Sequence, residues 1–178
     1  MRTAERLAGA KRIVVKVGSS SITGANEANL DLIVDFVAEQ SQSGKEVIVV
    51  SSGAIATAAP LIGLTVKSED LATSQALASI GQARLMGRYE RSLERHGLIP
   101  GQILLTVDNL DEEQPRTNAT RALERLLEIG VVPIINENDS VATQEIRFSD
   151  NDRLASRVSL LAQADLLILL SDVDSLYS

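Results

Sequence analysis

Small polar residues follow four aliphatic stretches of this sequence, and they are the residues best suited to binding chemistry. The four groups begin at Gly18, Ser51, Asn136 and Ser171. Glycine and serine also mark ordinary turns, so each group alone is weak evidence. In a parallel sheet, however, the carboxyl ends of the strands lie at one edge, and ligands bind there. Four such groups at equivalent strand ends therefore predict one binding site.

Glycines and a lysine within these groups favour an anionic ligand. Gly18 and Gly53 would let backbone N–H groups approach a phosphate or carboxylate closely. A helix beginning after Gly53 would add the positive end of its dipole. Lys16, one of four lysines, ends an aliphatic stretch. Its ammonium group either extends to the surface or contacts a transferred phosphoryl group.

Residues 136–152 form a polar segment that departs from the pattern of the rest. Its acids and asparagines are Asn136, Glu137, Asn138, Asp139, Glu145, Asp150, Asn151 and Asp152. Paired carboxylates could serve a hydrolase or ligate a metal. The asparagines favour hydrogen bonding to a polar substrate, and a merely solvated loop is the remaining alternative. We predict a long loop or hairpin here, and such loops are often functional.

Several other classes of protein are disfavoured. The sequence contains no cysteine, which excludes disulfides and thiolate metal sites. Its only histidine, His96, stands near a predicted helix end, where a cation is more common than a catalytic base. Neither the Gly-x-x-x-x-Gly-Lys-Ser/Thr phosphate loop nor the Gly-x-Gly-x-x-Gly dinucleotide motif is present. We therefore expect no protein-bound metal and no nucleotide site of these two kinds.

Charge and hydropathy narrow the setting. A net charge of −7 argues against nucleic-acid partners, because a phosphate backbone requires clustered Lys and Arg. No apolar stretch reaches the length of a membrane span, and the first residues lack a signal-peptide core. The expectation is a cytoplasmic protein without a membrane or nucleic-acid partner.

The elements that must position these residues follow from the apolar pattern. Aromatic residues make up only 2%, so Ala, Val, Ile and Leu must build the core. Strands are expected at residues 12–17, 46–50, 102–106, 131–135 and 165–170. Helices are expected around Leu30, Val34 and Val37, and at 68–96, 120–129 and 154–164. This alternation predicts an α/β fold, with a mostly parallel sheet sandwiched between helices.

The end of the sequence gives a further expectation. It stops at Ser178, shortly after the predicted strand at 165–170. Domains seldom end directly after a central strand. We therefore expect a C-terminally truncated domain.

With these motifs in view, the sequence resembles the glutamate 5-kinases, a branch of the amino-acid kinase family. The resemblance lies in Val14-Val15-Lys16-Val17-Gly18-Ser19, Val49-Val50-Ser51-Ser52-Gly53-Ala54-Ile55-Ala56, the stretch from Ile134 to Thr143, Glu145 to Asp152, and Leu169 to Tyr177. Shorter matches, Ser79-Ile80-Gly81-Gln82 and Gly101 to Thr106, fall in register between them. The Asn-Glu-Asn-Asp and Asp-Asn-Asp motifs distinguish this branch within the family.

The resemblance implies an activity and its partners. These kinases use ATP and Mg²⁺ to phosphorylate the γ-carboxylate of L-glutamate, the first step towards proline. It also implies an amino-acid kinase domain over residues 1–178, proline feedback and a homo-oligomer. Full members continue with a nucleotide-binding half that holds a second catalytic lysine. The present sequence has no lysine after Lys67, so we expect that half to be absent and activity impaired.

The resemblance also assigns roles to residues. Lys16 would contact the phosphates and stabilise charge in the transition state, and Asp152 would orient it. Glutamate would be held by Ser52, Asn136, Asp139, Asp150 and Asn151, and ATP by Lys16, Gly18, Ser19, Ser171 and Asp172.

Two alternatives stay open at this point. A catalytically silent module would bind glutamate or proline without turnover. Another amino-acid-kinase member would act on acetylglutamate, aspartate or a nucleotide, although its segment at 136–152 would need to differ.

Overall fold

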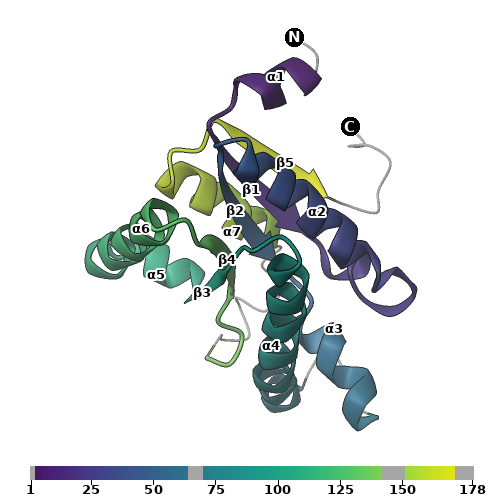
Figure 1. Ribbon diagram of the computed structural model, residues 1–178. Helices are drawn as coiled ribbons and strands as arrows, with labels where there is room; N and C mark the ends of the chain where they lie inside the picture. Colours follow the sequence, from purple (N-terminus) through teal and green to yellow (C-terminus); the bar gives the residue numbers. More distant parts are fainter. Residues whose placement is uncertain (1–2, 64–69, 142–150, 171–178) are drawn as a thin grey trace, which may run out of the picture.

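Five parallel strands form one sheet at the centre of the molecule (Figure 1). The computed structural model describes residues 3–63, 70–141 and 151–170. The strand order is β3-β4-β2-β1-β5, and every described pair is parallel. The strands are β1 (Arg12–Val17), β2 (Glu46–Ser51), β3 (Pro100–Leu105), β4 (Val132–Glu137) and β5 (Leu166–Leu170). The predicted α/β fold with a parallel sheet is confirmed.

Helices cover both faces of this sheet (Figure 1). They are α1 (Thr3–Gly9), α2 (Asn29–Gln42), α3 (Ala54–Ala58), α4 (Leu71–Glu94), α5 (Val107–Asp111), α6 (Glu113–Glu128) and α7 (Asn151–Leu161). Short 3₁₀ turns occupy Ser19–Ser21, Gly24–Asn26 and Ala59–Ile62. None of the helices described has the length and apolar character that a membrane crossing needs.

Three element boundaries near the site and in α6 differ from the sequence prediction. The predicted loop at 136–152 is wrong at both ends, because Asn136 and Glu137 belong to β4 and Asn151 begins α7. Asn136 and Glu137 stay in the strand by pairing with the last residues of β3. Helix α6 begins at Glu113, seven residues before the predicted Thr120. Its first half buries little apolar surface, so periodicity does not reveal it.

The alternation of side chains along the strands divides the core into two clusters. Ile13 and Val15 of β1 pack towards α2 and α4, whereas Val14 packs towards α6 and α7. By the same alternation Lys16 faces α7. Asn136 of β4 follows Ile134 towards α4. Polar side chains therefore reach the carboxyl edge of the sheet from both faces.

Arg12 connects the elements at the opposite end of the sheet, where the strands begin. Its guanidinium group donates to both carboxylate oxygens of Glu124, at 2.6 and 2.9 Å, and to Glu46 at 2.6 Å. It also donates to the carbonyl oxygen of Ala162 at 2.6 Å. These bonds to Glu124 and Glu46 raise the pKa of Arg12 above its ordinary value. One side chain thus ties β1 to β2, α6 and the end of α7.

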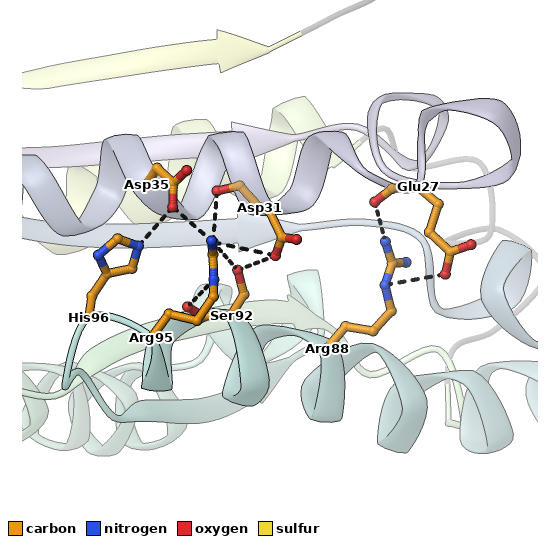
Figure 2. A network of polar contacts seen from close by, with 7 residues as sticks. All are labelled: Glu27, Asp31, Asp35, Arg88, Ser92, Arg95 and His96. Atoms are coloured by element: carbon orange, nitrogen blue, oxygen red, sulfur yellow. Dashed lines mark hydrogen bonds and ion pairs between the residues drawn. The ribbon is translucent and has the colours of Figure 1, made fainter.

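Helices α2 and α4 are joined by a network of ion pairs (Figure 2). His96 Nε2 lies 2.7 Å from Asp35 Oδ1, and Arg95 donates to the same oxygen at 2.8 Å. Ser92 donates to Asp31 at 2.6 Å. The hydrogen bond from His96, with the charge of Arg95, holds the pKa of Asp35 below its usual range. His96 has a structural partner here, in agreement with its predicted non-catalytic role.

Glycine at position 81 allows α4 to touch α3. A Cβ atom at Gly81 would lie 1.7 Å from the carbonyl oxygen of Ala54 and 2.5 Å from its carbonyl carbon. The neighbour is backbone, so it cannot move aside as a side chain tip can. Ala54 follows directly after Gly53, so this contact also fixes the turn at the end of β2.

Replacing Asp35 with Asn should lower the melting temperature at neutral pH. A group whose pKa is depressed by folding stabilises the protein above its unfolded pKa, and that stability is lost as pH falls through the folded value. The difference between variant and unchanged protein should therefore shrink below about pH 4. Thermal unfolding followed by circular dichroism from pH 7 to 3 measures this. Glu90→Gln, an exposed acid on α4, serves as control, and equal curves for D35N and E90Q would refute the prediction.

Gly81→Ala should destabilise the fold by about 3 kcal/mol, the upper range for overpacking, since backbone must shift. Gly87 lies on the same helix, and its nearest neighbour to an added Cβ is the tip of Arg91 at 3.5 Å. Gly87→Ala should therefore be neutral, or stabilising by up to about 1 kcal/mol through helix propensity. Urea denaturation of both variants measures the contrast. Similar midpoints for the two variants would show that α3 yields to α4.

Candidate functional site

The loops after β1 and β2 come together at the carboxyl edge of the sheet. The backbone N–H of Ser52 donates to the carbonyl oxygen of Val17 at 2.9 Å. Gly53 has φ 109°, a conformation that side chains disfavour. A Cβ atom there would lie 3.7 Å from the Cα of Ser19. The predicted glycine turn is therefore real, and the predicted helix start follows it as α3.

Lys16 is buried at this edge and paired with Asp152. The residue is only 8% exposed, and its Nζ lies 2.6 Å from Asp152 Oδ1 at the start of α7. The same Nζ lies 3.6 Å from where a Cβ at Gly18 would be. The alternative in which Lys16 extends its charge to the surface is therefore wrong. The ammonium group is held over the turn after β1.

A cavity of about 450 Å³ opens beside the ends of β2 and β4. Backbone and apolar side chains of the α3 region form one wall, and polar side chains form the other. The polar residues are Ser19, Ser52, Asn136, Glu137, Asp139 and Asn151. Asn151 Nδ2 donates to Ser52 Oγ, which joins the start of α7 to the end of β2. Asn151 Oδ1 is buried without a hydrogen-bond partner in the described part of the chain.

Asp139 supplies the cavity with an acid in an unusual environment. It is partly buried, and this burial raises the pKa of its carboxyl group above the ordinary value. Burial disfavours the charged form of a carboxyl group, and a nearby cation would offset that effect. Asp139 and Asn151 Oδ1 therefore both suit a ligand that carries a positively charged hydrogen-bond donor.

Most of the predicted site residues lie together. Described residues at this edge are Lys16, Gly18, Ser19, Ser52, Asn136, Asp139, Asn151 and Asp152. Lys16 and Asp152 adjoin the cavity through Asn151 and do not line it. Asp150, Ser171 and Asp172 lie outside the described residues.

Sequence reasoning missed two residues at the site. Glu137 lines the cavity as part of β4, and it was treated only as one acid of a polar loop. Gln82 on α4 accepts a hydrogen bond from Asn136 Nδ2 at 2.7 Å. The short family match from Ser79 to Gln82 was the available signal for Gln82. The apolar periodicity of the helix does not call for a glycine followed by a glutamine.

The described residues offer no cluster of three or more His, Cys, Asp or Glu side chains that could hold a metal ion.

Comparisons with known proteins all point to one family of kinases. The description "Amino acid kinase family" matches residues 11–178. A glutamate 5-kinase from Leifsonia xyli subsp. xyli is 54% identical over 173 residues, covering 97% of this chain and 64% of that protein. One from Clavibacter sepedonicus is 55% identical over 180 residues, covering 100% and 70%. One from Thermobifida fusca is 52% identical, covering 99% and 46%.

These lengths and one solved structure complete the comparison. The chain spans 46 to 70% of the length of these three relatives. An isopentenyl phosphate kinase structure superposes with a TM-score of 0.65 at 19% identity, over 93% of this chain and 74% of that one. At that identity it supports the fold alone. The family match from residue 11 onwards and the close glutamate 5-kinase relatives confirm the resemblance: the chain belongs to the amino acid kinase family.

Proposed function

We propose that this chain serves the ATP-dependent phosphorylation of the γ-carboxylate of L-glutamate, which gives glutamyl 5-phosphate in the first step of proline biosynthesis. The observation that carries the proposal is the buried Lys16, paired with the half-exposed Asp152, beside a cavity suited to an ammonium group. A γ-carboxylate oxygen attacks the γ-phosphorus of ATP. The bond from that phosphorus to the β–γ bridging oxygen breaks, and ADP leaves with the electron pair.

Lys16 contributes electrostatic stabilisation in this reaction. Phosphoryl transfer needs positioning and charge compensation, with no covalent enzyme intermediate. A buried ammonium group is most effective there, because little water screens it. Asp152, at 2.6 Å, keeps the ammonium group in place and so acts as a positioning residue. Together they define the end of the site where phosphate is transferred.

The cavity holds the acceptor. Asp139 and Asn151 Oδ1 would bind the α-ammonium group of glutamate, because both are acceptors in a partly buried setting. Ser52 and Asn136 line the same space and offer polar contacts to the acceptor. Asp150, next to Asn151 in sequence, is proposed to line it too.

ATP would approach from the turn after β1. Gly18 and Ser19 flank the ammonium group of Lys16 and are proposed to contact phosphates, with Ser171 and Asp172 beginning the nucleotide site. Mg²⁺ bound to the phosphates would reduce their negative charge. We further propose that these 178 residues are the acceptor-binding part of the kinase domain, and that the remaining nucleotide contacts belong to sequence that the longer relatives possess.

A silent binding module is the second candidate. It is favoured by one observation: the described residues build the acceptor cavity, and Asp139 and Asn151 Oδ1 there suit an ammonium group. Such a module would bind glutamate, or proline as a feedback ligand, without turnover. A homo-oligomer is proposed in either case.

Lys16→Ala should reduce turnover by at least about a thousandfold, because it removes the charge that compensates the transferred phosphoryl group. A coupled ATP-to-ADP assay with L-glutamate and Mg²⁺ measures this. Lys11→Ala is the matched control, since Lys11 lies exposed at the other end of β1. N-acetyl-L-glutamate, which lacks the ammonium group, should be a poor acceptor.

Calorimetric titration of L-glutamate on the same sample separates the two candidates. Glutamate binding without turnover, retained in Lys16→Ala, would support the silent module. Absence of both binding and turnover would contradict both candidates.

Binding of L-glutamate should weaken as pH falls through the raised pKa of Asp139. Protonation there removes the negative charge that attracts the α-ammonium group, so affinity is high above this pKa and lost below it. The effect on folding has the opposite sign, because a raised pKa makes the uncharged form the more stable one. Calorimetry at falling pH, from 8 down to the ordinary titration range of a carboxyl group, follows the affinity. Asp139→Asn should bind weakly at every pH, and a pH dependence that survives in this variant would contradict the assignment.

A further inference from the structure

Two hydrogen bonds fix the orientation of the Asn136 and Gln82 carboxamides. The backbone N–H of Glu137 donates to Asn136 Oδ1 at 2.8 Å. Asn136 must therefore present Nδ2 on its other side, and this group donates to Gln82 Oε1 at 2.7 Å. If the Gln82 amide were reversed, its Nε2 would face Asn136 Nδ2, and two hydrogen-bond donors would point at each other. The backbone of β4 thus determines which way Gln82 on α4 faces.

This orientation leaves one donor over. Gln82 Nε2 is buried and has no hydrogen-bond partner in the described part of the chain. A buried donor without an acceptor is unfavourable, because it has lost its hydrogen bonds to water. Gln82 lines a second cavity of about 240 Å³, whose wall includes Glu137 and Asp139. These two acids also line the larger cavity, so the cavity that Gln82 lines adjoins the acceptor cavity.

Gln82 also lies at the non-reacting end of the site. Its partner Asn136 belongs to β4, and Lys16 belongs to β1, with β2 between them. Two strand spacings amount to about 10 Å. A group bound at Gln82 is therefore well away from the phosphate that Lys16 contacts.

We propose that Gln82 is an acceptor-binding residue that recognises the α-carboxylate of an amino-acid substrate. Its Oε1 holds Asn136, and its Nε2 donates to an oxygen of that carboxylate. Asp139 binds the ammonium group on the same carbon, so the two residues read the zwitterionic end of the acceptor. The inference rests on the proposed function, because it names a further contact within the same site.

The local packing supports a fixed position for this side chain. Gly81, next to Gln82, packs α4 against the backbone of Ala54. The hydrogen bond from Asn136 Nδ2 holds the Gln82 amide at 2.7 Å. The amide therefore needs less ordering when the acceptor binds, and this favours affinity.

Two substitutions separate binding from support. Gln82→Glu keeps an oxygen that accepts from Asn136 but has no donor for the ligand, and Gln82→Met removes both functions at similar size. Both should raise the dissociation constant and KM for L-glutamate about tenfold or more, the effect of a lost hydrogen bond to a charged group. The KM for ATP should stay unchanged. Ser79→Asp, which adds a negative charge to the same wall of the second cavity, measures the effect of charge alone.

The outcomes distinguish this inference from the proposed function. Impaired glutamate binding in Q82E and Q82M, beyond that in S79D, supports it. Wild-type affinity in Q82E with impaired Q82M would show that Gln82 only supports Asn136, and would overturn it. Equal losses in Q82E and S79D, with Q82M unaffected, would overturn it as well. If the unchanged protein binds no L-glutamate by calorimetry, the proposed function fails and this inference falls with it.

Discussion

A positive charge on an otherwise aliphatic buried strand is the constraint on which the site depends. Lys16 is the last residue but one of β1, and the residues around it, Ile13 to Val15 and Val17, are fully buried. A buried charge is costly unless it is paired, so the chain must bring a carboxylate to the end of this strand. Asp152 meets the requirement by starting α7 there. This ion pair fixes where α7 begins, with Asn151 beside Asp152, while Leu154, Ala155 and Val158 pack the helix into the core.

The second constraint is the close approach of α4 to α3. Because Gly81 has no side chain, the backbone of Ala54 reaches the surface of α4. That contact holds the Gly53 turn on one side and Gln82 on the other. The cavity between β2 and β4 is shaped by this approach, since α3 forms its apolar wall and α4 supports Asn136 from behind. Chemistry at the strand ends thus depends on a packing contact between two helices.

The strands and the grouping of polar residues at their ends could be predicted from the sequence, because both follow from local patterns. Aliphatic stretches revealed β1 and β2, and glycine with serine marked their ends. The start of α7 at Asn151 and the continuation of β4 through Glu137 could not be predicted. Pairing with β3 and the demand of Lys16 for a counter-ion decide these boundaries, and both are contacts between distant segments. Gln82 escaped notice for the same reason, since its role exists only once α4 lies against β4.

The proposed site has an end for the transferred phosphate and an end for the acceptor, and the two belong to opposite faces of the sheet. Lys16 faces α7, whereas Asn136 faces α4, and only the carboxyl edge connects them. The acceptor and the phosphoryl group that it receives must together span this edge, over about two strand spacings or 10 Å. A molecule with carboxylates at both ends can do so, because one carboxylate is held beside Asn136 by hydrogen bonds of about 2.9 Å while the other reaches the phosphoryl group. A single-ended acid would contact one face and leave the other unused. Selectivity for a dicarboxylate then arises because side chains along β1 and β4 alternate between the two faces of the sheet.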